Sequence, residues 1–359
     1  MQKLLIQLVT WNGKKYIPYL FDSLRKQSFT DFHLFILDNG STDGTQELIE
    51  KELQNFQFEY TFEKNGKNVG FAGGHNQIYK LKSQNSKVKS FDYILLLNQD
   101  VYLTSDCIER MVNFLKKNPD AAAVSPRLMR WNFAEASEGI EKSFSFFVDS
   151  LGLRVFRNRR VIEKYAGQVW EEKKSRMELS FRTHDDAMEV FGVSGALPMF
   201  RWSCLEVVSF DDHTFFDTSY HSYKEDVDLA YRLRIAGLRS YILLDSVAYH
   251  DRSAFGVDRV GDRISIQNKK VQPEWIKYHS YKNHLMTFYK NEYWQNTILD
   301  FPWILWYELK KFIYFFLFDR SILRGLGEVW KGRTELRKKR LMVKKIRKAS
   351  WQDLREWWK

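Results

Sequence analysis

Ile94-Leu95-Leu96-Leu97-Asn98-Gln99-Asp100-Val101 is the stretch of sequence that decides the fold. A continuous apolar run that follows polar and charged sequence is typical of a strand buried on both faces of a sheet. The run stops at Asn98 and Asp100, so an amide and a carboxylate end the strand. Open α/β sheets bind ligands at the carboxyl ends of their strands, and a carboxylate there can hold a divalent ion. The alternative is a strand that simply ends in a polar turn.

The same pattern of an apolar strand followed by polar residues occurs twice earlier in the chain. Apolar spacing predicts strands over 4–9 and 34–37 and helices over 14–27 and 45–53. Strands that alternate with helices imply a parallel sheet with right-handed crossovers. The sequence therefore predicts an α/β fold around a mostly parallel sheet.

Further along, the pattern is uneven. It predicts helices that begin at 76 and 224, a helix over 107–117, and strands over 121–125, 241–244 and 246–249. Residues 189–196 are expected to form a strand that enters a tight turn. Between 129 and 184 the periodicity weakens, and the charged run 157–160 is expected to be exposed. We predict that this region is a variable, partly mobile segment.

Polar residues follow the predicted strands in three places. They are Thr10-Trp11-Asn12-Gly13, Asp38-Asn39-Gly40-Ser41-Thr42-Asp43 and the glycine-rich stretch 65–76. A fourth motif, Lys224-Glu225-Asp226-Val227-Asp228, opens a helix. With these motifs in this order, the chain resembles family 2 glycosyltransferases over roughly residues 3–252. More narrowly, it is similar to the bacterial branch described as rhamnosyltransferases.

The resemblance implies a GT-A fold, a Rossmann-like sheet flanked by helices, and a set of residues that bind a nucleotide sugar. Those residues would be Thr10, Trp11, Asn12, Asp38, Asn39, Ser41, Asn68, Gly70, Gly73 and Asn98. A carboxylate such as Asp38 can accept hydrogen bonds from a pyrimidine or a ribose. Its alternative role is to close an Asx-type turn, because Asp-Asn-Gly-Ser is strong turn chemistry.

The metal site implied by the resemblance consists of Asp100 and His250. The family usually has Asp-x-Asp where this chain has Asn98-Gln99-Asp100, so one charge is missing. Oxygen ligands with one imidazole suit Mn²⁺ or Mg²⁺. The alternative for His250 is a histidine that simply ends a strand.

The catalytic base implied by the resemblance is Asp226, with Glu225 as an accessory that contacts the acceptor. A carboxylate is a competent base when it is hydrogen-bonded to the hydroxyl that it deprotonates. The alternative is that both acids only complement the dipole at the start of a helix. Asp228 is expected either to cap the helix or to pair with Arg232 one turn further on.

The net charge of +11 is concentrated at the end of the chain. Residues 319–359 hold 14 Lys/Arg against 5 Asp/Glu, and an aromatic block at 301–318 precedes them. Glu308, Lys310 and Lys311 interrupt that block, which is also short for a spanning helix. We predict a helix in the interface of an anionic membrane. The alternatives are a helix packed on the catalytic domain and, more remotely, a nucleic-acid-binding tail.

Two cysteines without metal-ligand spacing and an N-terminus that opens into a strand predict a cytoplasmic protein without a signal peptide. We expect a catalytic domain over 1–290, divided into a nucleotide-binding half (1–105) and an acceptor half (106–290). A helical, basic, membrane-associating segment would follow over 291–359.

The predicted activity is that of an inverting, metal-dependent glycosyltransferase at the inner face of the cell membrane. The resemblance favours dTDP-L-rhamnose as donor and a polyprenyl-diphosphate-linked glycan of a cell-surface polysaccharide as acceptor. UDP-hexose and UDP-galactofuranose donors are the nearest alternatives. A nicotinamide-dependent dehydrogenase would need Gly-x-Gly-x-x-Gly after the first strand, where this chain has Thr10-Trp11-Asn12-Gly13-Lys14-Lys15.

Overall fold

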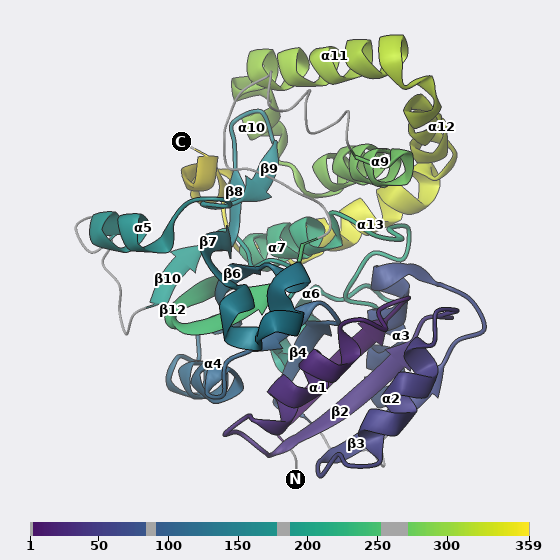
Figure 1. The fold of residues 1–359 in the computed structure, drawn as a ribbon. Coiled ribbons are helices and arrows are strands. Elements are labelled where there is room, and N and C mark those ends of the chain that lie inside the picture. The colour runs from purple at the N-terminus through teal and green to yellow at the C-terminus, as the bar shows by residue number, and fades with distance from the viewer. Residues whose placement is uncertain (1–2, 84–90, 178–186, 253–271, 359) are drawn as a thin grey trace.

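A computed structural model describes residues 3–83, 91–177, 187–252 and 272–358, and within them a ten-stranded sheet forms the centre (Figure 1). Its strands are β1 (Leu4–Thr10), β2 (Phe32–Asp38), β3 (Glu59–Lys64), β4 (Tyr93–Asn98), β5 (Val101–Leu103), β6 (Ala121–Trp131), β7 (Phe144–Ser150), β10 (Ala187–Val190), β11 (Met199–Arg201) and β12 (Arg239–His250). A separate two-stranded sheet consists of β8 (Leu153–Val155) and β9 (Val161–Glu163).

The strand order is β10-β12-β6-β11-β4-β1-β2-β3, with β5 paired to β12 and β7 paired to β6. Strands β1 to β4 are parallel to one another, and β12 is parallel to β6. Because β11 runs antiparallel to both β4 and β6, these six strands all point in one direction. The predicted mostly parallel sheet is confirmed, with antiparallel additions that the sequence pattern did not indicate.

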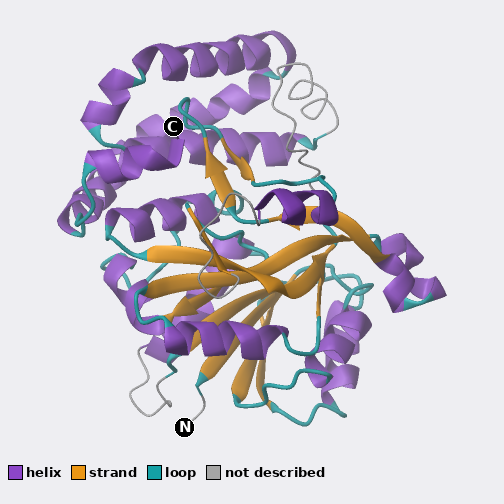
Figure 2. Ribbon diagram, turned by 90° about the vertical axis from the view of Figure 1, so that its left-hand side faces the viewer, coloured by secondary structure: helices purple, strands orange, loops and turns teal. Residues whose placement is uncertain are grey.

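The helices lie on both faces of this sheet and above one end of it (Figure 2). They are α1 (Ile17–Arg25), α2 (Thr45–Leu53), α3 (Gly70–Ser83), α4 (Cys107–Lys117), α5 (Trp170–Met177), α6 (Trp202–Val208), α7 (Glu225–Ile235), α9 (Glu274–Asn291), α10 (Trp294–Leu299), α11 (Phe301–Phe318), α12 (Arg324–Lys331), α13 (Arg333–Lys345) and α14 (Trp351–Arg355). The last six of these form the helical C-terminal region.

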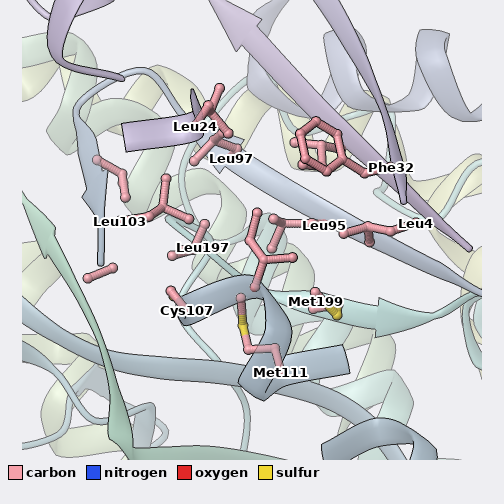
Figure 3. Packing of buried hydrophobic residues seen from close by; sticks show 14 of the residues in the cluster. Leu4, Leu24, Phe32, Leu95, Leu97, Leu103, Cys107, Met111, Leu197 and Met199 are labelled. Carbon is pink, nitrogen blue, oxygen red and sulfur yellow. The ribbon is translucent and has the colours of Figure 1, made fainter. Parts of the chain in front are cut away.

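Two apolar clusters cover the two faces of the sheet, because successive side chains of a strand point to opposite faces. Leu4 and Leu8 of β1 pack with α1, α2 and α4, whereas Leu5 packs on the other face with α3, α6 and α7. Figure 3 shows part of the first cluster, where Leu24 of α1 lies beside Leu97 of β4. The continuous apolar run of β4 is therefore buried on both faces, as its sequence predicts.

Helices α2 and α4 have the predicted bounds, but α3 begins at Gly70, six residues before the predicted start. The first six residues of α3 were not predicted as helical, because they contain glycines and glycine disfavours helices. A Cβ at Gly74 would lie 2.9 Å from the Val9 side chain, which is too close. Glycine at this position lets α3 pack directly on β1.

Regular elements fill much of the described part of the region 129–184, where the sequence pattern is weak, and its predicted variability and mobility stay predictions. Strands β7, β8 and β9 and helix α5 lie in it, and β7 pairs with β6. The charged run 157–160 was expected to be exposed, but the Arg159 side chain is buried. It bonds Glu292 and lies 3.0 Å from Asp300, so its partners come from the C-terminal region. The predicted strands at 241–244 and 246–249 are one strand, β12, with an irregularity between Leu243 and Val247.

The C-terminal region is anchored to the rest of the fold by buried charges. The Lys290 ammonium of α9 bonds Asp217 and lies 2.9 Å from Asp228 of α7. Lys339 of α13 bonds Asp217 from the other side at 2.5 Å. Arg232 bonds Asp228 at 3.1 Å, as predicted. Removing one partner of a buried ion pair typically costs about 3–5 kcal/mol, so α9 and α13 are held firmly against the segment that precedes α7.

The predicted boundary at residue 290 falls at the end of α9 and stays a prediction. Beyond it, Val343, Leu354 and Trp358 share an apolar cluster with Val227 and Tyr231 of α7. Helix α11 instead lies at the periphery (Figure 1) and exposes much of its apolar surface. Among the described residues, no helix has the length and apolar character required to span a membrane.

Candidate active site

A cleft of about 530 Å³ lies where the ends of β4 and β12 meet the start of α7 and of α9. Five of the residues singled out from the sequence line it: Asn98, Asp100, Glu225, Asp226 and His250. They come from three well-separated segments of the chain. The fold therefore gathers the predicted metal ligands and the predicted acids in one cavity.

Asp100 and His250 lie side by side because of how β5 pairs. Asp100 sits in the turn between β4 and β5, and β5 runs antiparallel to the end of β12, with Val101 opposite His250. His250 Nε2 lies 3.4 Å from Asp100 Oδ1. The backbone amide of Asp251 also donates to the carbonyl of Asp100 at 3.0 Å, which fixes the two strand ends together.

Behind His250 lies a buried carboxylate that sequence reasoning missed. His250 Nδ1 is 2.9 Å from Asp149 Oδ2, and Asp149 also accepts hydrogen bonds from Arg252 at 2.8 and 2.9 Å. Burial lowers the pKa of His250, but the carboxylates of Asp100 and Asp149 outweigh this and raise that pKa to about 10. Burial raises the pKa of Asp149, but Arg252 and His250 reverse this and hold it well below its usual range.

These residues fit a divalent ion. Ligand atoms about 2.1 Å from an octahedral ion lie about 3 Å apart, close to the spacing of Asp100 Oδ1 and His250 Nε2. A carboxylate that accepts from the other ring nitrogen is the usual support of a metal-binding histidine. Within the described residues there is no group of three or more His, Cys, Asp or Glu placed to hold a metal. The remaining ligands would have to be water and diphosphate oxygens, as Mg²⁺ commonly uses.

Glu225 and Asp226 open α7 after a strained stretch of backbone. Tyr223 and Lys224 both have φ of 70°, a left-handed conformation that is uncommon outside glycine. Asp226 is partly exposed in the cavity, and its Oδ2 accepts a hydrogen bond from the Gly195 amide at 3.3 Å. Strained residues of this kind persist where the surrounding structure fixes them, and they cluster at functional sites.

Glu225 is buried, and its Oε2 has no hydrogen-bond partner among the residues that the structure describes. Burial, and then the neighbouring Asp226 carboxylate, raise the pKa of Glu225 to about 8. At neutral pH Glu225 therefore keeps its proton in most molecules. An uncharged carboxyl in a cavity can donate a hydrogen bond to a ligand.

The loop residues after β1 and β2 form a hydrogen-bonded network. Asp38 is fully buried, and its oxygens accept from the Ser41 amide at 2.8 Å and from Thr10 Oγ1 at 2.9 Å. Asn12 joins this network, since its backbone amide donates to Ser41 Oγ at 2.9 Å. The turn that the sequence offered as the alternative for Asp38 is present, and a direct contact with a nucleoside stays a prediction.

The glycine-rich segment is also occupied by protein contacts. Asn39 Nδ2 lies 3.1 Å from both Asn68 Oδ1 and the carbonyl of Gly70. A Cβ at Gly70, where φ is +81°, would lie 2.3 Å from the His221 carbonyl, and one at Gly73 would lie 3.2 Å from the Val69 side chain. Internal packing alone thus requires glycine at 70, and the predicted approach of a nucleotide to these glycines remains to be tested.

The middle residue of Asn98-Gln99-Asp100 joins two loops. The amide of Trp11 donates to Gln99 Oε1, and Gln99 Nε2 donates to the carbonyl of Trp11, both at 3.0 Å. The Trp11 side chain itself is 47% exposed. Gln99 therefore links the end of β4 to the loop after β1, while Asn98 and Asp100 face the cavity.

Sequence reasoning also missed Glu163, Ser194, Arg252 and Trp275, all of which line the cavity. Arg252 Nη1 lies 3.1 Å from Glu163 Oε1, and Glu163 accepts from Ser194 at 3.1 Å. Arg252 could have been suspected, because it follows His250 by two positions. Asp149 and Glu163 gave no signal, since they lie in the region of weak periodicity.

Comparison with known proteins gives a consistent picture. Residues 6–165 match the family described as Glycosyl transferase family 2. The chain is 28% identical over 113 residues to the abequosyltransferase RfbV of Salmonella typhimurium, covering 31% of this chain and 32% of that protein. It is 26% identical over 121 residues to the poly(ribitol-phosphate) beta-N-acetylglucosaminyltransferase TarS of Staphylococcus aureus, covering 33% of this chain and 20% of that one. The chain thus aligns with about a third or less of the length of these curated relatives.

The fold has a counterpart among solved structures. A crystal structure of GalNAc-T7 with UDP, GalNAc and Mn²⁺ superposes with a TM-score of 0.57 at 12% identity. The superposition covers 82% of this chain and 49% of that chain. At this level of identity the likeness shows the fold alone.

Proposed function

We propose that this family 2 glycosyltransferase, whose residues 6–165 match the family and whose fold is of the GT-A type, transfers a sugar from a nucleotide-sugar donor. The acceptor would be a hydroxyl of a cell-surface glycan, and the transfer would invert the anomeric centre. The observation that carries the proposal is that Asp100, His250, Glu225 and Asp226 line one and the same cavity. This cavity combines a place for a metal-bound diphosphate with a carboxylate available as base.

In the proposed reaction the acceptor oxygen attacks the anomeric carbon directly. Asp226 takes the proton of the acceptor hydroxyl, the new C–O bond forms, and the bond from the anomeric carbon to the diphosphate oxygen breaks. Asp100 and His250 would hold Mn²⁺ or Mg²⁺, which neutralises the charge of the departing nucleoside diphosphate. The loops that carry Thr10, Asp38 and Asn68 would bind the nucleoside. No covalent intermediate on the enzyme is required.

The donor that we favour is dTDP-L-rhamnose, because of the rhamnosyltransferase-like motifs. UDP-hexose and UDP-galactofuranose are the nearest alternatives. The relatives above are named for transfer of abequose and of N-acetylglucosamine, so the family tolerates different sugars on related domains. The choice of donor therefore needs a direct test.

That test is thermal stabilisation by a panel of nucleotide sugars, each with and without Mn²⁺. A ligand present at 100 times its Kd stabilises the folded state by about 2.7 kcal/mol. We expect dTDP-L-rhamnose with Mn²⁺ to raise the melting temperature most, and chelation or Asp100→Ala to remove the metal-dependent part. If a UDP-sugar raises the melting temperature most, that UDP-sugar and not dTDP-L-rhamnose is the donor. If no nucleotide sugar changes the melting temperature, the proposed function is contradicted.

We also propose that α11 binds an anionic membrane surface and brings the enzyme to a polyprenyl-diphosphate-linked acceptor on the cytoplasmic face. The exposed apolar side chains of α11 include Trp303, Trp306, Phe312 and Leu317. Exposed patches of this kind mark interaction surfaces. The basic residues of the segment 319–359 supply the complementary charge.

Two of the charged residues that interrupt the aromatic block in the sequence have side chains that point toward the rest of the protein. Glu308 bonds His284 of α9 at 2.7 Å, and Lys311 is buried and lies 3.4 Å from Glu308. The outer face of α11 is therefore more apolar than its sequence suggests. The same helix contributes Tyr307 to the lining of the active-site cavity, which supports an acceptor held at a lipid surface.

Leu317→Glu should weaken binding to anionic vesicles about tenfold or more. Leu317 is 61% exposed, so folding should be unaffected, and loss of one inserted leucine costs about 1.5 kcal/mol or more. The measurement is cosedimentation with phosphatidylglycerol vesicles at rising salt, which should weaken binding without abolishing it. Leu341→Glu on α13, at 58% exposure, makes the same charge change off this face and should bind normally. An equal loss of vesicle binding in both variants would contradict the proposal. So would a protein that does not bind vesicles but forms a dimer that Leu317→Glu dissociates.

A further inference from the structure

One wall of the cavity has no role in the chemistry described so far. It consists of Trp275, Ile276 and Ser280 of α9 and Tyr307 of α11, next to Tyr223. All but Tyr223 lie in the C-terminal helices, and all five residues lie outside residues 6–165, the segment that matches the family. The metal-binding end of the cavity instead comes from β4 and β12.

Trp275 and Tyr223 form an aromatic pair on this wall. Their ring centroids lie 5.4 Å apart at an interplanar angle of 54°. Trp275 remains 48% exposed, so a large apolar surface faces open space beside the cavity. Burial, and then the nearby Glu225, raise the pKa of Tyr223 to about 12, so its ring stays neutral.

The pair is held in place from α9. Asn283 is fully buried, and its Nδ2 donates to the carbonyls of Ser222 at 3.0 Å and of Tyr223 at 2.7 Å. These bonds fix the left-handed backbone of Tyr223, two residues before Glu225. Helix α9 thus carries one aromatic ring and positions the other.

A second observation at the same wall points to a ligand. Glu225 lines the cavity, and its buried Oε2 has no hydrogen-bond partner among the described residues. A buried polar atom without a partner is costly unless a ligand or water completes it. An aromatic surface beside such a carboxyl matches a pyranose ring, which has apolar C–H faces and hydroxyls on its rim.

Resting on the proposed function, we propose that Trp275 and Tyr223 bind the ring of the acceptor sugar, with Glu225 hydrogen-bonded to one of its hydroxyls. This arrangement leaves a neighbouring hydroxyl within the part of the cavity that Asp226 lines. The C-terminal helices would then determine which acceptor is used, while the loops after β1 and β2, together with Asp100 and His250, bind the donor.

The test is saturation-transfer difference NMR with methyl glycosides of rhamnose, glucose, galactose and N-acetylglucosamine, in the presence of UDP or dTDP. We expect transfer to ring C–H protons of at least one glycoside in the unmodified protein. Trp275→Leu should weaken its binding on the order of tenfold, the size expected when an aromatic anchor is lost. Trp275→Phe should restore most of the binding.

Trp330→Leu on α12 is the matched control, because Trp330 is 69% exposed and does not line the cavity. Glycoside binding that is unchanged in Trp275→Leu, or absent from the unmodified protein, would overturn the inference. So would weaker thermal stabilisation of Trp275→Leu by the nucleotide sugar, since it would assign this wall to the donor. Failure of the proposed function itself is distinguishable, because the unmodified protein would then bind no nucleotide sugar.

Discussion

Asp226→Asn should lower the rate of transfer about 10²- to 10⁴-fold while nucleotide-sugar binding stays near that of the unmodified protein. The amide has the size of the carboxylate and can still accept the bond from the Gly195 amide, but it cannot take a proton. The measurement is kcat with saturating donor, together with the thermal shift produced by that donor. A near-normal kcat in Asp226→Asn would contradict the assignment of Asp226 as the catalytic base.

Asp120→Asn is the matched control, because Asp120 is an exposed carboxylate that forms a surface ion pair with Arg239, remote from the cavity lining. It should change neither quantity. A comparison with Glu225→Gln separates the two neighbouring acids. If Glu225 were the base, Glu225→Gln would lose as much activity as Asp226→Asn.

The pH profile provides an independent check on the same assignment. The raised pKa of about 8 means that Glu225 is mostly protonated below pH 8 and ionised above it. If protonated Glu225 donates a hydrogen bond to the acceptor, kcat/KM should fall as the pH rises through about 8. Glu225→Gln should lack that alkaline limb, since an amide does not titrate. Activity that instead rises through pH 8 would assign the base to Glu225.

Asp149→Asn should weaken the binding of Mn²⁺ about 10- to 100-fold, the usual effect of removing the carboxylate behind a metal-binding histidine. Asp149 orients the His250 ring through Nδ1, so that Nε2 faces Asp100. The measurement is loss of the free Mn²⁺ signal in electron paramagnetic resonance, with UDP present, and it does not depend on turnover.

Glu163→Gln controls for the effect through Arg252, which bonds both Asp149 and Glu163. Glu163 has no bond to His250 among the contacts described, so Glu163→Gln should keep most of the Mn²⁺ affinity. Equal weakening in both variants would show that the network acts through Arg252. Unchanged affinity in Asp149→Asn would show that His250 needs no support, or that it is not a ligand.

Local sequence determined the sheet and the ends of its strands. Apolar side chains on both faces of β1 place it between two layers of helices, and the apolar run of β4 likewise requires cover on both faces. That Asn98, Asp100 and His250 follow strands could also be read from the pattern. Strands β4 and β12 are not neighbours in the sheet, however, and it is the pairing of β5 with β12 that brings Asp100 to His250. The position of Glu225 and Asp226 at the start of α7 also followed from the pattern.

Only the tertiary structure decided which charges are buried and what they bind. Arg159 bonds Glu292 and Asp300, Asp149 supports His250, and Glu308 turns toward His284. Periodicity reports which face of an element is apolar, but the partner of a buried charge lies far away in the sequence. Burial of a charge is stable only when that distant partner is in place. For this reason the strand ends that form the site could be read from the chain, whereas Asp149 and the wall formed by Trp275 could not.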